Sequence, residues 1–175
     1  MKKVLKFKHW QLFILIVLTA AWTSPSPLKE IINSIAIITF LIWIYAIGIY
    51  GQEKLESLKI PTLNTKLFKI NIILFPILLI ITFLLPPEQT TENTQAEFNT
   101  QTILLIPITL YMFFAFFQTI VFSCKTLTMI ELKREVKFSD YLVNLILIAF
   151  LMIGIWILQP KITKLLVENE NNATE

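Results

Sequence analysis

The chain has 175 residues, of which 55% are hydrophobic and 15% are charged, and its mean hydropathy is +0.70. Soluble domains carry about 25% charged residues, mixed along the chain. Here five long stretches contain no Asp, Glu, Lys or Arg: residues 9–28, 31–52, 70–87, 98–124 and 141–160. Apolar runs of about 18 residues or more are typical of membrane spans, so the composition predicts a membrane protein and argues against a soluble globular one.

The residue counts also limit the chemistry. The chain has one Cys and one His, too few for a Cys/His zinc cage, a disulfide or a pair of haem ligands within one chain. Its three glycines, Gly48, Gly51 and Gly154, do not form a glycine-rich phosphate loop. We therefore expect no metal and no cofactor.

The first predicted span covers about residues 10–23. Trp10 and Trp22 lie near its ends, as expected for side chains that anchor a helix at the two membrane–water interfaces. The basic lead and short apolar core also resemble a signal peptide, and cleavage would leave one span fewer. Trp22 and the lack of a clean small-x-small cleavage site favour retention. The second span covers about residues 31–50, after a Ser-Pro-Ser-Pro turn.

Three more spans follow, at about residues 68–85, 103–123 and 141–158. Pro76 predicts a kink in the third, and the fifth is expected to open at a Ser139 or Asp140 cap and to close at Gln159-Pro160. Continuous apolar runs of this length favour helices over the alternating strands of a barrel. The sequence thus predicts an all-α fold: one transmembrane domain over residues 1–175, built as a bundle of five helices, or of four if the first is cleaved.

Span four carries the clearest pattern. Ala115, Thr119 and Ser123 repeat at a four-residue spacing with Gln118 alongside, which predicts a small-residue stripe for helix packing. After the span, apolar residues alternate with charges in residues 124–140, which suggests an amphipathic helix that continues the span along the membrane surface. Trp156 is a third expected interfacial anchor, in the fifth span.

The basic residues predict the orientation. Eleven of the 15 Lys and Arg residues fall in segments 1–9, 51–67 and 124–140. Lys69, at the edge of the second segment, brings this set to twelve. The positive-inside rule places these segments in the cytoplasm, next to an anionic leaflet. Segments 24–30, 86–102 and 159–175 are then extracytoplasmic, which puts the C-terminus outside, although Lys161 and Lys164 oppose that placement. This distribution explains the net positive charge of the chain, so we expect no nucleic acid as a partner.

The same sequence narrows the function. No ionisable residue lies deep in a predicted span, which argues against a proton-coupled pump. Catalytic triads, paired intramembrane aspartates and metal-ligand spacings are all lacking, and a Cys124–His9 pair is disfavoured. We therefore expect a non-catalytic structural or partner subunit that contacts the lipid bilayer and a membrane-protein partner or a second copy. The alternatives are a small transporter or channel subunit that works as an oligomer and, third, an enzyme with a membrane-embedded lipid substrate.

Several stretches resemble a family of small, uncharacterised multi-pass membrane proteins of Bacteroidota. They are KFKHWQLF (6–13), WIYAIG (43–48), SCKTLTMIEL (123–132), VKFSDY (136–141) and GIWILQPKI (154–162), of which KHWQLF and GIWxxQP are the specific parts. The family pattern often has an acidic residue near Asn144 and a proline near Met152, and this chain differs at both. The resemblance implies a bacterial inner-membrane location and implies no activity.

Overall fold

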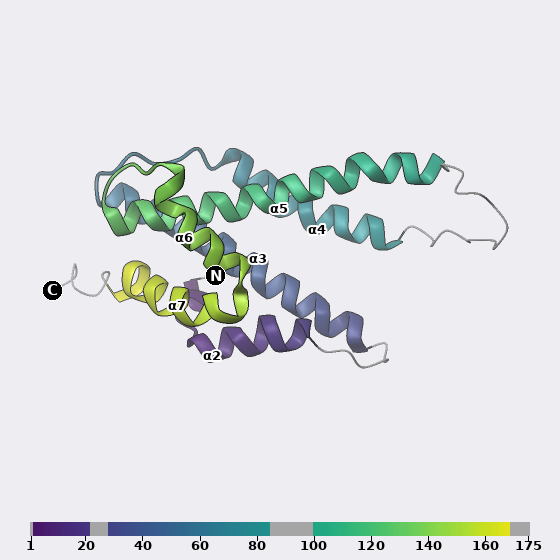
Figure 1. Ribbon diagram of the computed structural model, residues 1–175, viewed down its shortest axis with the longest axis horizontal. Coiled ribbons are helices and arrows are strands. Elements are labelled where there is room, and N and C mark those ends of the chain that lie inside the picture. The colour runs from purple at the N-terminus through teal and green to yellow at the C-terminus, as the bar shows by residue number, and fades with distance from the viewer. Residues whose placement is uncertain (1, 22–27, 85–99, 169–175) are drawn as a thin grey trace. The chain divides into compact units, whose positions relative to one another are not determined.

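A computed structural model describes residues 2–21, 28–84 and 100–168 (Figure 1). Every regular element within these ranges is a helix, which confirms the all-α prediction. The described residues form two compact units. Unit 1 takes its residues from Met1–Thr65 and Ile120–Glu175, and unit 2 consists of Lys66–Thr119.

The N-terminal part of unit 1 is a short helical segment packed on a long helix. It comprises α1 (Lys2–Leu5), α2 (His9–Leu12) and the π-helical turn η1 (Phe13–Leu18), and it contacts α3 (Leu28–Ser57) through α1 and η1. Leu5, Leu12 and Ile16 are buried. The helix α3 extends past both ends of the predicted span at 31–50. It ends where Lys59 adopts a left-handed backbone and Ile60 N–H donates to the Leu55 carbonyl.

The helix α5 (Thr100–Leu132) begins in unit 2 and ends in unit 1. It continues the predicted span at 103–123 without a break for nine residues, and Lys133 ends it with a left-handed backbone. Leu127 and Ile130, which we expected on the apolar side of a surface helix, are buried. The extension is therefore part of the core of unit 1.

The C-terminal part of the chain departs from the sequence prediction. Residues 141–158 do not form one helix but belong to two, α6 (Phe138–Ala149) and α7 (Leu151–Thr163), followed by the π-helical turn η2 (Lys164–Glu168). Phe150 separates them with a non-helical backbone (φ −98°, ψ 61°), and α7 folds back against α6 (Figure 1). Pro160, expected to close the span, lies inside α7.

A glycine allows this fold-back. A Cβ atom at Gly154 would overlap the backbone carbonyl of Leu147, two residues before the end of α6. Because the obstacle is backbone, it cannot rotate away, so only glycine permits this approach of α7 to α6. We name the two helices and their turn the C-terminal hairpin (residues 138–163).

Unit 2 pairs α4 (Lys66–Leu84) with the first part of α5. Pro76 and Pro107 lie inside these helices. The rings of Phe75 and Phe116 meet at 5.5 Å between centroids, and Phe68 is fully buried. These contacts join the two helices into one layer.

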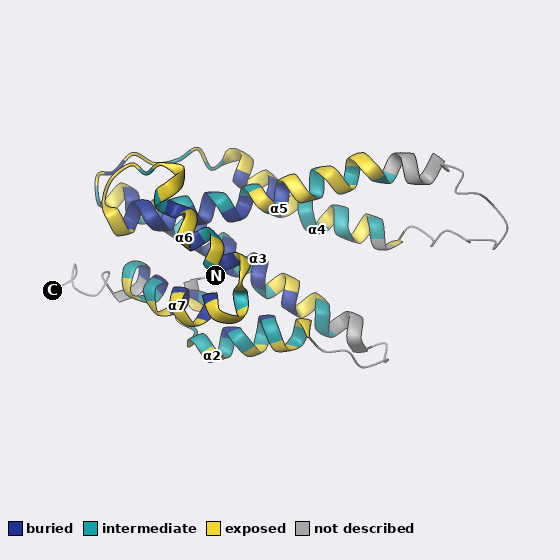
Figure 2. Ribbon diagram, viewed as in Figure 1, coloured by how far each residue is buried: buried dark blue, intermediate teal, exposed yellow. Residues whose placement is uncertain are grey.

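Among the residues that the structure describes, two helical segments are long and apolar enough to cross a membrane, judged by length and composition: Ile32–Ser57 and Leu105–Leu132. Figure 2 shows exposed residues along both helices of unit 2, and many of them are large and apolar, including Ile73, Ile80, Leu110 and Phe113. Soluble monomers rarely expose apolar patches of this extent. Both observations are consistent with a membrane location.

Candidate functional site

The polar side chains within unit 1 form hydrogen bonds between its helices, and the first set joins α3 to the end of α5. Ser123 donates its hydroxyl to the Ile44 carbonyl at 3.0 Å, and the Gln52 amide donates to the Thr126 hydroxyl at 2.8 Å. Both contacts advance in the same chain direction, so the two helices run parallel here. A Cβ atom at Gly51 would meet the Thr126 methyl group, so glycine keeps the helices close.

The second set centres on Gln159 of α7, whose side chain is buried and fully paired. Its amide oxygen accepts from the Trp43 indole N–H at 2.9 Å. Its amide nitrogen donates to the backbone carbonyls of Leu5 and Phe7, at 3.0 and 2.8 Å. One side chain therefore joins α7 to α3 and to the N-terminal segment. The Thr163 hydroxyl adds a 3.0 Å bond to the same Leu5 carbonyl.

The third set connects both helices of the C-terminal hairpin to α5. The buried Asn144 amide donates to the Thr128 hydroxyl at 2.7 Å. Lys161 donates to the Asn144 side-chain oxygen at 3.1 Å, and it also pairs with Glu131 at 2.6 Å. Because Glu131 is the last charged residue of α5, this ion pair fixes the end of α7 beside the end of α5.

Unit 2 has its own polar cluster, beside an apolar hollow. Tyr111 donates its hydroxyl to the Asn71 side-chain oxygen at 2.8 Å, and the Asn71 amide donates to Gln118 at 3.1 Å. The hollow has a volume of about 410 Å³ and is lined by Phe75, Thr82, Thr109, Met112, Phe113 and Phe116. The lining carries no charged group, so the hollow suits an apolar occupant.

The residues predicted to pack span four are placed as follows. Ala115, Thr119 and Ser123 are buried, at 0–2% exposure. Ser123 and Gln118 form side-chain hydrogen bonds to another helix, whereas the Thr119 hydroxyl donates to the Phe116 carbonyl of its own helix. Their joint role as a packing stripe stays a prediction.

Two of the three tryptophans that were predicted as interfacial anchors lie within the described residues. Trp10 and Trp156 are about half exposed, and Trp22 lies outside the described residues. The Trp156 ring lies 4.5 Å from the His9 ring and 5.8 Å from the Phe13 ring, measured between centroids. The two described anchors therefore belong to neighbouring helices, close to the start of α2.

Sequence reasoning missed the pair Trp43–Gln159 and the pair Lys161–Glu131. One signal was present: Trp43 lies inside a predicted span, whereas tryptophan that anchors a helix lies at its ends. The partners could not be found from the sequence, because they are separated by 116 residues in the first pair. Four of the stretches that carry the family resemblance, 6–13, 43–48, 123–132 and 154–162, supply these contacts and the Trp156–His9 ring contact.

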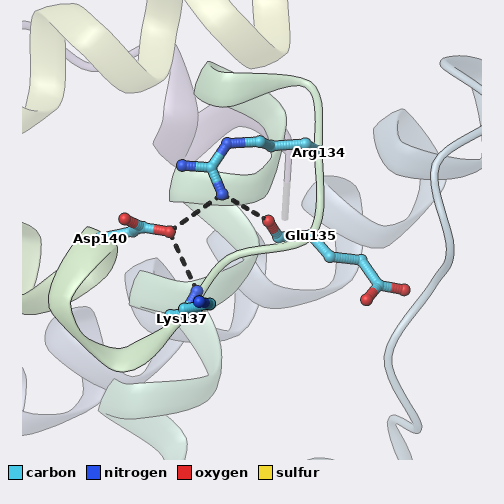
Figure 3. A network of polar contacts seen from close by, with 4 residues as sticks. All are labelled: Arg134, Glu135, Lys137 and Asp140. Atoms are coloured by element: carbon cyan, nitrogen blue, oxygen red, sulfur yellow. Dashed lines mark hydrogen bonds and ion pairs between the residues drawn. The ribbon is translucent and has the colours of Figure 1, made fainter.

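A surface network holds the start of α6 (Figure 3). The Asp140 carboxylate accepts from the Lys137 backbone N–H at 3.0 Å and from the Arg134 guanidinium at 3.1 Å, and Arg134 also donates to the Glu135 carbonyl. Asp140 is thus the third residue of α6 and not its cap, which is Lys137. The backbone bond from Lys137, followed by the bond and charge of Arg134, lowers the pKa of Asp140.

The polar side chains described above connect helices to one another. Within residues 2–21, 28–84 and 100–168, no three His, Cys, Asp or Glu side chains are placed to hold a metal ion. Cys124 is buried, and the His9 ring contacts the Trp156 ring at an interplanar angle of 47°. No family model, curated protein or solved structure matches the chain.

We predict that Gln159→Leu destabilises the protein. The substitution leaves the buried Trp43 N–H without its partner and removes one bond from each of the Leu5 and Phe7 carbonyls, of which the Leu5 carbonyl keeps its bond from Thr163. A buried group left unpaired costs about 1–3 kcal/mol. Gln11→Leu is the control, because the Gln11 side chain accepts a hydrogen bond from the exposed Lys8 N–H. Thermal unfolding in detergent measures both. Equal midpoints for the two variants would contradict the role of Gln159.

The pKa of Asp140 predicts an acid-sensitive start of α6. Because the folded state lowers this pKa, the ionised carboxylate stabilises the fold above the ordinary carboxyl pKa, and that contribution is lost as the pH falls through the lowered value. Arg134→Ala should raise the pKa part of the way, since the Lys137 backbone bond remains. Carboxyl NMR titration measures the shift, with Lys133→Ala as the neighbouring cation control. An unchanged midpoint in Arg134→Ala would show that the ion pair has no influence.

Proposed function

We propose that the chain is a multi-pass protein of the bacterial inner membrane that serves as a non-catalytic structural or partner subunit. The observation that carries the proposal is the pairing of polar side chains between apolar helices. Gln52, Asn144 and Gln159 bond to residues of other helices, so they supply packing specificity. A substrate path would need such groups to face a water-filled space instead.

The proposed membrane placement starts from α3 and α5, the two helices that satisfy the length and composition test. α4 supplies a further crossing, because its 19 residues include most of the charge-free stretch 70–87. The charge-free stretch 9–28 is proposed as another, because its helical residues 9–20 contain no break of the kind that Phe150 makes within 141–160. The basic segments 1–9, 51–67 and 124–140 are proposed to face the cytoplasm. The inner-membrane location and the relation to the Bacteroidota family rest on the sequence resemblance and on this charge distribution.

A face of α5 is proposed to receive the partner. Ile106, Leu110, Phe113 and Phe117 recur at helical spacing and are 45–69% exposed, whereas Ala115 between them is buried. Large aromatic and aliphatic side chains on one helix face give van der Waals contact with another membrane helix. We name this set the α5 outer stripe, and we propose that it contacts a membrane protein or a second copy of the chain.

The double variant Leu110→Ala/Phe117→Ala should release the associated chain. Purification in mild detergent, followed by mass spectrometry and measurement of the particle mass, compares it with the wild type. Ile70→Ala/Ile73→Ala is the matched control, because these two residues are similarly exposed on α4. Both variants should keep the wild-type unfolding midpoint, since exposed positions tolerate truncation.

Two results would overturn the proposed function. The wild-type protein could purify as a lone monomer without any stoichiometric partner. Alternatively, vesicles containing the purified protein could show solute flux above that of empty vesicles, which would favour the transporter or channel subunit.

A further inference from the structure

The C-terminal hairpin has an apolar outer face with no protein partner in unit 1. Val143 and Ile146 of α6 and Met152, Ile153 and Ile157 of α7 are about half exposed or more. We propose that this hairpin enters only the cytoplasmic leaflet, so that lipid acyl chains cover its outer face and the end of α7 returns to the cytoplasmic side. This inference rests on the proposed membrane location.

The length of the hairpin fits one leaflet. α6 has 12 residues and α7 has 13, which correspond to about 18 and 20 Å at 1.5 Å per residue. A full crossing requires a hydrocarbon thickness of about 30 Å, and a single leaflet contributes about half of it. The turn η2 continues α7 to Glu168, but Lys161 and Lys164 limit the apolar part of this helix to the residues before them. The apolar part of neither helix reaches across, and the break at Phe150 prevents the two helices from forming one span.

The tip of the hairpin is suited to lipid. Phe150, Met152 and Ile153 are 63–65% exposed, although turns that face water favour Gly, Asn, Asp, Ser and Pro. Part of the backbone of the tip is paired internally, because Phe150 N–H donates to the Ile146 carbonyl and the N–H groups of Ile153 and Gly154 donate to the Phe150 carbonyl. Internal pairing of this kind is what backbone in hydrocarbon requires.

Charged residues mark the other end of the hairpin. Arg134, Lys137 and Asp140 lie where α6 begins, and Lys161 and Lys164 lie where α7 ends. The contacts of Lys161 with Glu131 and Asn144 hold these two ends together. The hairpin therefore has an apolar tip and a charged base, the polarity expected for insertion from one side.

Contacts with the N-terminal segment indicate the side of the membrane on which α7 ends, independently of the charges at the base of the hairpin. Gln159 and Thr163 bind the carbonyls of Leu5 and Phe7, and the Trp156 ring lies beside His9. The end of α7 thus lies beside the start of the chain, on the side where the positive-inside rule puts the N-terminus. Lys161 and Lys164 then join the cytoplasmic set, which rises to 14 of the 15 basic residues.

The first test is the side of the C-terminus in the full-length chain. Green fluorescent protein fused after Glu175 should fluoresce, and alkaline phosphatase fused there should be inactive, because each works on only one side of the inner membrane. Active phosphatase with dark fluorescent protein would overturn the inference and restore a fifth crossing. Recovery of the fusion in the soluble fraction would overturn the membrane location itself, which distinguishes the two failures.

The second test is the depth of the tip. In a Cys124→Ser background, a fluorophore is attached at Phe150→Cys, and the protein is reconstituted with lipids that carry a nitroxide quencher deep in the acyl chain. Quenching at position 150 should exceed several-fold that at the matched control Lys164→Cys. Thermal unfolding checks that both variants keep the wild-type fold. If either variant fails to fold, the fusion test still applies, because it uses the chain without substitutions.

Two outcomes of the depth test contradict acyl-chain cover. Quenching of the position 150 probe by aqueous iodide would show that the tip lies in water. Protection from both quenchers would show that protein, such as a second copy of the chain, covers the tip.

Discussion

The buried amide of Gln159 is the contact on which the arrangement of unit 1 depends. An unpaired amide in an apolar interior is costly, so each of its hydrogen bonds fixes a neighbour. The Trp43 indole fixes α7 against the long helix α3, and two carbonyls of the N-terminal segment fix the start of the chain against the end of α7. Helices that are otherwise apolar all round have few features that select one neighbour over another, and this amide provides one.

The same constraint explains why polar residues are few in these helices and why several of them occur in pairs, although the buried side-chain oxygen of Asn33 in α3 accepts no hydrogen bond among the described residues. Asn144 has Thr128 and Lys161, Gln52 has Thr126, and Asn71 has Tyr111 and Gln118. Each pair gives its helices one preferred register. The pairs lie between elements and not around a hollow, since the hollow in unit 2 is lined by apolar rings with two threonines. This distribution supports a protein that presents surfaces to lipid and to a partner.

The helices were predictable from charge-free stretches, and their ends were not. The predicted spans at 31–50 and 103–123 lie inside α3 and α5, which run on to Ser57 and Leu132. The predictions stopped at the first charges, but a helix continues where charged side chains reach solvent and apolar ones such as Leu55 and Leu127 stay buried. Hydropathy indicates which residues are buried in lipid or protein, and it does not indicate where a helix ends.

The C-terminal hairpin was not predictable from hydropathy, because the apolar composition of residues 141–160 is equally compatible with one long helix and with two short ones. The break depends on the approach of Gly154 to the Leu147 carbonyl, and the fold-back is held by partners far away in the chain, Leu5 and Glu131. Of the predicted site residues, Ser123 and Gln118 bond to other helices as their polarity suggested. Trp156, expected as an interfacial anchor, lies beside the His9 ring, a contact that its sequence position did not indicate.

The central claim is that α7 returns to the side of the N-terminus. The most direct measurement is the distance between spin labels at Lys6→Cys and Lys164→Cys in lipid nanodiscs, in a Cys124→Ser background. Both positions are exposed, so labels should not disturb the core. The account predicts a distance well below the hydrocarbon thickness of about 30 Å, and a distance at or above that thickness would contradict it.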